Sequence, residues 1–190
     1  MHPHKHSDRW QNNEVLQSIH EGWQRHLAVD ELFHSSDYFI EKSRKISEDI
    51  RKLPLDNVHL KPFMVGHIGL ELILDTLLIK NKIIEPILFY EHLERCQVDD
   101  IEQFIFLNNI ADAAQFRTFY HRFNEVRYLL SYKSNESIVY ALNRIQYRLS
   151  AAFLNEKDTF ILQDAIADCM NYVELDYLTV FEEIEWRLIK

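Results

Sequence analysis

The chain has 190 residues, of which 47% are hydrophobic, so it is long and apolar enough to bury the core of one ordinary domain. Its net charge of −9 argues against general nucleic-acid binding, which requires clustered Lys and Arg on the phosphate backbone. Three glycines, four prolines and long stretches of 3.6-residue periodicity predict an all-α fold. We expect a single domain over residues 1–190, a bundle of about seven or eight helices.

The two cysteines, Cys96 and Cys169, lack the spacing of metal ligands, and no segment resembles a signal peptide or an uncharged membrane span. These features predict a cytoplasmic protein without membrane insertion, in which both thiols are structural.

The N-terminal half begins with a polar, His-rich stretch, MHPHKHSDRW, which we interpret as a flexible arm over residues 1–10 or as an artefact of the assigned start. A first helix is expected from about Asn13 to Phe33. Ser35 or Ser36 is expected to cap a second, charged helix that ends before Pro54. The side chains expected on the inner face of the first helix are Val15, Leu16, Ile19, Trp23 and Leu27.

The segment FMVGHIGLELILDTLLI, residues 63–79, predicts a central helix because its only ionisable groups are His67, Glu71 and Asp75. Its glycines, Gly66 and Gly69, indicate close approach of a neighbouring helix or of a substrate, or simply tight helix packing. Further helices are expected over 84–96, 99–109, 111–132, 136–154 and 159–189. Their predicted N-caps are Asp99, Ser134 or Asn135, and Asp158.

Two helices carry matching polar stripes, with ligand-type residues at positions i, i+4 and i+8 on a largely apolar face. The first stripe is His26, Asp30 and His34, and the second is His67, Glu71 and Asp75.

Buried carboxylates need a proton, a cation or a metal, and neither helix has a Lys on this face. Imidazoles and carboxylates are the usual ligands of Zn, Mn and Fe. The two stripes therefore predict a divalent metal site of six ligand-type residues. The alternative is a set of metal-free pairs between buried histidines and acids.

The stretch GWQRHLAVDELFH, followed by HIGLELILD, resembles bacterial acyl carrier protein phosphodiesterases. The phrases FYEHL and VRYLLSY extend the likeness over most of the chain. The resemblance implies an all-helical, HD-like metallohydrolase fold and a divalent metal, usually Mn or Mg. It implies an activity in lipid metabolism and fatty acid biosynthesis, the release of 4′-phosphopantetheine from holo-acyl carrier protein.

By this resemblance, His26 and Asp30 are metal ligands, and His34 occupies a position where the family has Asp or His. Asp75 matches a family Asp, and Glu71 matches an acidic position one turn earlier. His67 is added by the spacing alone. The family's N-terminal elements, an Asn-(Phe or Tyr)-Leu-(Ala or Ser)-His segment and a further metal-binding Asp, have no counterpart here, so we expect either a start assigned too late or an incomplete site.

Hydrolysis of a phosphodiester requires an activated water, stabilisation of phosphoryl charge and an acid for the leaving alkoxide. His34 or His67 is a candidate for the proton transfer instead of a ligand role. The basic segment 114–148 offers Arg117, Arg122 and Arg127 for substrate phosphate or for docking of an acidic carrier protein. The alternative is that these arginines form solvated ion pairs.

Three other functions fit parts of the pattern. One is a zinc-dependent phospholipase C-like hydrolase. Another is a ferritin-like di-iron bundle, suggested by the spacing of Glu31 and His34, although such a bundle needs a second element of this kind. The third is a non-catalytic helical binding or scaffold protein.

Overall fold

The computed structural model describes residues 12–57, 59–110 and 112–189, and these residues contain nine α-helices, one short 3₁₀ helix and no strand. The predicted all-α class is confirmed. The predicted arm over residues 1–10 lies outside the described residues. In chain order the helices are α1 (Glu14–Ser35), α2 (Asp37–Arg51), α3 (Pro62–Lys80), α4 (Pro86–Glu94), α5 (Val98–Asn108), α6 (Ala113–Val126), η2 (Tyr128–Ser131), α7 (Asn135–Ser150), α8 (Glu156–Glu174) and α9 (Leu178–Ile189).

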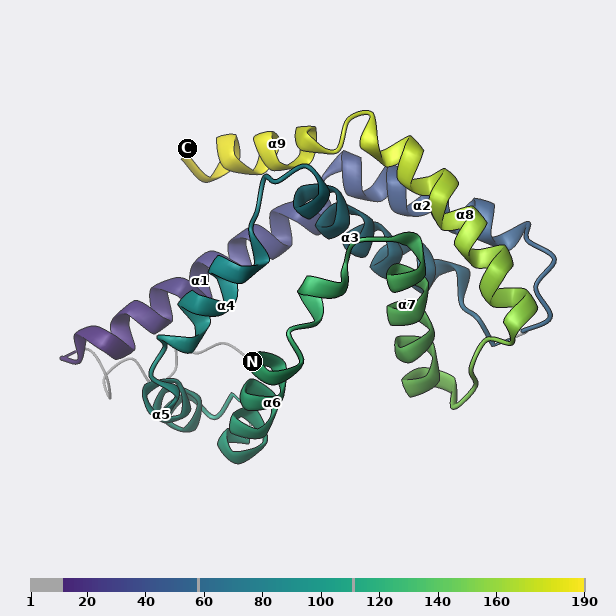
Figure 1. Ribbon diagram of the computed structural model, residues 1–190. Coiled ribbons are helices and arrows are strands. Elements are labelled where there is room, and N and C mark those ends of the chain that lie inside the picture. The colour runs from purple at the N-terminus through teal and green to yellow at the C-terminus, as the bar shows by residue number, and fades with distance from the viewer. Residues whose placement is uncertain (1–11, 58, 111, 190) are drawn as a thin grey trace. The chain divides into compact units, whose positions relative to one another are not determined.

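The helices gather into two compact units (Figure 1). Unit 1 is the described part of Met1–Glu31 together with Pro86–Tyr128, and unit 2 is the described part of Leu32–Glu85 together with Leu129–Lys190. The last residues of α1 thus belong to unit 2, with α2, α3, α7, α8 and α9. The single domain expected over residues 1–190 stays a prediction.

Unit 2 is built around α3, which contacts α2, α7 and α8 (Figure 1). Leu70, Ile73 and Leu77 on α3 are fully buried, so the predicted central helix is confirmed. By length and composition α3 would also suit a membrane span, but 61% of its apolar window is buried inside the protein. Packing in the core accounts for this apolar surface.

A tight turn joins α1 to α2, and Ser36 fixes it. The Ser36 hydroxyl donates to the carbonyl of Phe33 at 2.7 Å and accepts from the backbone N–H of Phe39 at 3.1 Å. Of the two serines expected to cap α2, Ser36 is therefore the cap. This turn holds the end of α1 beside the start of α2.

Helix α2 lies unusually close to α3 at Gly66. A Cβ atom at this position would lie 2.0 Å from Ser47 Oγ and 2.3 Å from the backbone oxygen of Ser43. At Gly69 a Cβ would make only ordinary contacts, the nearest at 3.7 Å. Close approach of a helix is thus confirmed at Gly66 only, and it brings α2 against the turn of α3 that carries His67.

Unit 1 has a smaller core. Leu16 of α1 packs with Phe104 of α5, supported by Ile19. Val15 is 50% exposed, so its predicted place on the inner face is wrong, because the helix turns Leu16 inward instead. The Tyr120 hydroxyl of α6 donates to the carbonyl of Leu93 and ties α6 to α4.

Of the three N-caps predicted for the later helices, two are wrong and one is confirmed. Gln97 precedes α5, and Asp99 lies inside its first turn. Asn155 caps α8 by accepting from the N–H of Asp158 at 2.7 Å. Ser134 caps α7, and its N–H donates to Ser137 Oγ at 3.2 Å in a capping box.

Candidate metal centre

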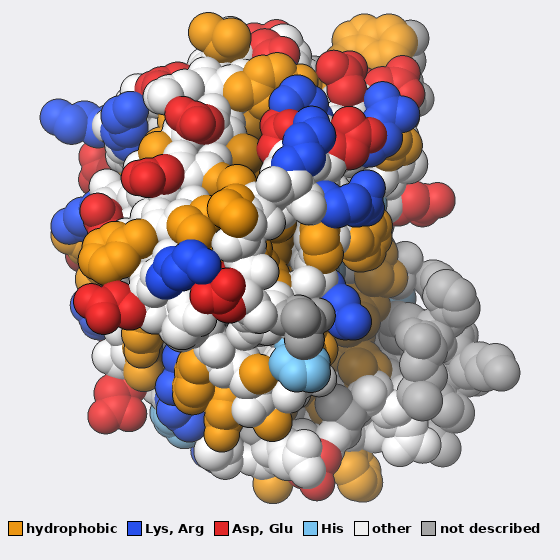
Figure 2. Space-filling view, turned by 90° about the vertical axis from the view of Figure 1, so that its right-hand side faces the viewer, with side chains coloured by type: hydrophobic (Ala, Val, Ile, Leu, Met, Phe, Trp, Pro, Cys, Tyr) orange, Lys and Arg blue, Asp and Glu red, His pale blue; other side chains and the backbone are white. Residues whose placement is uncertain are grey.

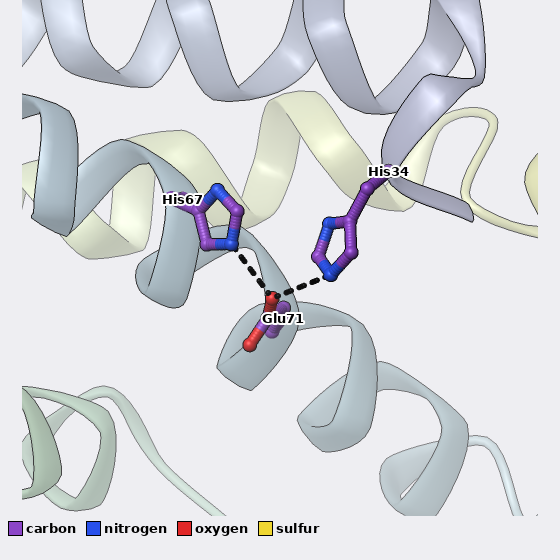
Figure 3. Close-up of side chains that lie close together, drawn as sticks. All are labelled: His34, His67 and Glu71. Carbon is purple, nitrogen blue, oxygen red and sulfur yellow. Dashed lines mark ion pairs between the residues drawn. The ribbon is translucent and has the colours of Figure 1, made fainter. Parts of the chain in front are cut away.

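Three ligand-type side chains of unit 2 converge at one point (Figure 3). His34 comes from the last turn of α1, whereas His67 and Glu71 lie one turn apart on α3. One ligand atom from each residue can be chosen so that all three lie within 4.8 Å of one another. The sequence placed these residues on two separate stripes, and the fold brings them together.

Both imidazoles aim the same nitrogen at the same carboxylate oxygen (Figure 3). His67 Nε2 lies 3.3 Å from Glu71 Oε1, and His34 Nε2 lies 3.8 Å from it. These separations are longer than the usual N–H···O hydrogen bond. The carboxylate is therefore approached from two sides without being tightly bonded by either ring.

Aromatic rings hold the two imidazoles in place. The rings of His34 and His67 stack with centroids 4.8 Å apart and an interplanar angle of 18°. Phe39 stands edge-on to both, at 4.7 Å from His34 and 4.9 Å from His67. Phe33 also packs against His34, with ring centroids 5.1 Å apart. Such packing restricts ring rotation, so the nitrogens are pre-positioned toward Glu71.

The two nitrogen–oxygen separations can be compared with a metal site. In a tetrahedral zinc site with bonds of 2.0–2.1 Å, neighbouring ligand atoms lie about 3.3 Å apart, close to the 3.3 and 3.8 Å from Glu71 to the two imidazoles. Two histidines and one carboxylate also form the set of three protein ligands that leaves a position for water in catalytic sites. The side chains of His34, His67 and Glu71 are 31%, 34% and 38% exposed, so solvent reaches the centre.

Asp75 lies one turn beyond Glu71 on α3 and is half-buried. Burial, with the nearby charge of Glu71, raises the pKa of Asp75 to about 6. Burial thus makes this carboxyl costly to ionise inside the protein. Asp75 is not part of the group formed by the other three residues.

His26 and Asp30 are exposed on the part of α1 that belongs to unit 1. The structure does not group them with His34, His67 or Glu71. Their assignment as metal ligands stays a prediction. The expectation that this part of the stripe is buried on an apolar face is wrong, because both side chains are exposed. Spacing along a helix could not tell which part of the stripe would pack in unit 2.

The three arginines expected to bind phosphate or a partner lie on α6 and at its C-terminal end, in unit 1. Arg117 forms ion pairs with Asp99 and Glu102 on α5, which raise its pKa. Arg127 forms an ion pair with Glu94.

Arg122 is the exposed arginine of the three for which the described residues show no ion pair. Figure 2 shows basic side chains lying among acidic ones on the face that it presents. Two of the three candidate arginines, Arg117 and Arg127, are thus neutralised by acidic neighbours.

Sequence reasoning missed the wall of the cavity beside the centre. His34 and His67 line a pocket of about 450 Å³, together with Arg44 and Arg51 of α2. The sequence signal for this wall was the seven-residue spacing of Arg44 and Arg51, which places both arginines on one face of the helix. Otherwise the sequence of this segment indicates only a charged helix.

Comparison of the chain with family models, curated proteins and solved structures finds no match. The support for a metal centre therefore comes from its own geometry.

Proposed function

We propose that this protein is a metal-dependent phosphodiester hydrolase whose divalent metal ion is held by His34, His67 and Glu71. The observation that carries the proposal is the convergence of two imidazole nitrogens on one carboxylate oxygen, at 3.3 and 3.8 Å. No Lys or Arg among the described residues forms an ion pair with Glu71, so a bound cation is a natural counter-charge.

A bound Mn, Mg or Zn ion supplies Lewis acidity and makes a water nucleophilic near neutral pH. The chain's own residues supply the rest. Phe33 and Phe39 hold the imidazole rings so that the ligand atoms keep their direction. His34 and His67 also remain candidates for proton transfer to the leaving alkoxide, a role that the variants below separate from metal binding.

The substrate proposed from the resemblance is holo-acyl carrier protein, from which 4′-phosphopantetheine would be released. An HD-like metallohydrolase of this kind requires an all-α fold whose metal ligands come from neighbouring helices. A cytoplasmic location would follow from this substrate. Asp75, on the same helix as Glu71, is proposed as a further ligand on the same basis.

The first experiment measures metal content after reconstitution with Mn²⁺ or Zn²⁺. We expect about one metal ion per chain in the wild type, and little metal in His67→Ala and Glu71→Gln, because each removes one of three ligands. His59→Ala is the matched control, since His59 is an exposed histidine of the same unit. A wild-type protein that takes up no metal, or variants that keep it, would remove the proposal.

The second experiment measures hydrolysis of holo-acyl carrier protein, bis(p-nitrophenyl) phosphate and a phospholipid in parallel. Release of phosphopantetheine supports the proposed substrate, whereas lipid hydrolysis alone supports the phospholipase C-like alternative. A variant at His34 that keeps its metal but loses kcat identifies a proton-transfer role. A metal-loaded protein that cleaves none of the three substrates would support a non-catalytic helical protein.

A further inference from the structure

The pocket beside the metal centre has a basic wall formed by α2. Ser43, Arg44, Ser47 and Arg51 line it from this helix, and His34 and His67 line it from the centre. All six belong to unit 2. The pocket has a volume of about 450 Å³, within the range of small-molecule sites.

Arg44 and Arg51 lie seven residues apart, two turns of α2, and therefore face the same side of the helix. Both are exposed, and neither forms an ion pair with an acidic group of the described residues. Arg117 and Arg127, by contrast, are held by acidic neighbours. The guanidinium groups of Arg44 and Arg51 are therefore available to a ligand in the pocket beside the imidazoles.

Glu48 lies between the two arginines on the same pocket wall. The wall therefore carries two positive charges and one negative charge, a net charge of +1. This net charge matches the single negative charge of a phosphodiester. Arg also suits phosphate oxygens, because its planar guanidinium can donate two parallel hydrogen bonds to them.

The close packing at Gly66 keeps this wall beside the centre. A Cβ there would collide with Ser43 and Ser47, both of which line the pocket. Gly66 is the residue before His67 on α3, so the same contact positions the basic wall and the imidazole. Phe63, 74% exposed, adds an apolar rim that can accept an uncharged organic arm of the ligand.

We propose that Arg44 and Arg51 form the phosphate-binding wall of the active site and hold the substrate's phosphodiester group in the pocket next to His34 and His67. This inference rests on the proposed function for the identity of the substrate. The binding of phosphate itself requires only the pocket and its arginines. The phosphate site and the proposed hydrolase function can therefore be tested separately.

The test measures the rise in melting temperature caused by millimolar inorganic phosphate over sodium chloride of equal ionic strength. The protein is full-length and kept in EDTA, so that a metal ion does not contribute. A ligand that binds only the folded state raises its melting temperature. We expect a rise in the wild type, a smaller rise in Arg44→Gln and in Arg51→Gln, and none in the double variant.

Arg144→Gln is the matched control. Arg144 is an exposed arginine of the same unit on α7, away from the pocket lining, and this variant should keep the wild-type rise. Absence of a phosphate effect in the wild type would overturn the inference, as would an equal effect in the double variant. Loss of the phosphate effect in the double variant, with the wild-type rise kept in Arg144→Gln, supports the inference.

A second measurement separates this inference from the proposed function. Metal content of the double variant should equal that of the wild type, and KM for bis(p-nitrophenyl) phosphate should rise at least tenfold. A metal-free wild type whose phosphate effect still depends on both arginines would refute the metal hydrolase and retain the phosphate site. An unchanged KM in a metal-loaded, active double variant would refute the phosphate-binding wall.

Discussion

His34 and His67 stack face to face at 4.8 Å, although one belongs to α1 and the other to α3. Both turn Nε2 toward Glu71. The stacking follows from the tight turn at Ser36 and from Phe39, whose ring touches both imidazoles. If they share one cation, their contributions to its affinity must be coupled.

We therefore predict a non-additive double-mutant cycle. His34→Ala and His67→Ala should each weaken binding of Zn²⁺ at least tenfold, and the double variant should bind it little more weakly than either single variant. Competition with a chromophoric chelator measures these affinities. Additive losses would mean that the two rings act at separate sites.

Gly66 and Gly69 offer a paired test of helix packing. Ala at position 66 would force α2 and α3 apart, because its Cβ would meet the backbone oxygen of Ser43 at 2.3 Å. We expect Gly66→Ala to lower the free energy of unfolding by about 1–3 kcal/mol or more. Gly69→Ala should be neutral or raise it by up to about 1 kcal/mol, since Ala favours the helix. Urea denaturation checks both, and equal effects would contradict the packing described.

The raised pKa of Asp75 predicts that the stability of the fold depends on pH. Its pKa rises from 3.8 when solvated to about 6 in the fold. A carboxyl with a raised pKa binds its proton more tightly in the folded state, so stability is fully present below the unfolded pKa and falls as pH rises toward 6. Above that pH the loss is complete and amounts to up to about 3 kcal/mol.

Asp75→Asn should remove this loss. In EDTA we expect its free energy of unfolding to exceed that of the wild type at pH 7 and to approach it near pH 4. Glu185→Gln, at an exposed acid of the same unit, serves as the control. Parallel curves of unfolding free energy against pH for the wild type and Asp75→Asn would show that burial does not disfavour ionisation of this carboxyl.

The positions of most helices could be predicted from periodicity and capping residues, but two ends could not. The predicted helix over 159–189 divides into α8 and α9 without a Gly or Pro. Contacts between residues that are distant in sequence fix the turn between α8 and α9 instead. Lys42 donates to Asp176 at 2.8 Å, and Asn81 donates to the hydroxyl of Tyr177 at 3.0 Å. The count of helices exceeded the expected seven or eight because such contacts leave no local signal.

The end of α6 also could not be predicted from local sequence. Arg127 has a φ of 48°, a left-handed conformation that sequence rules associate with Gly or Asn. The predicted helix over 111–132 therefore stops at Val126. For the centre, helical spacing found the ligand types, and only tertiary packing selected His34, His67 and Glu71 from the six residues proposed.

Asp158, expected as a cap, has a different structural role that can be tested. It is fully buried, and its carboxylate accepts from the N–H groups of Asp56 and Asn57, both at 2.8 Å. Asp158→Asn would leave one of these donors without its acceptor. We expect the free energy of unfolding to fall by about 2 kcal/mol or more. Asp164→Asn, at an exposed position of the same helix, should change it little, and equal losses would contradict this role.

The two thiols should differ sharply in reactivity. Cys96 is exposed, whereas Cys169 is buried, and burial raises the pKa of the Cys169 thiol to about 11. The thiolate is the reactive form, and at pH 8 it would make up about a thousandth of a thiol with this pKa. We expect a disulfide reagent such as DTNB to label one thiol per native chain quickly and the second only on unfolding. Cys96→Ser should abolish the fast phase, and a fast phase that survives this substitution would place Cys169 at the surface.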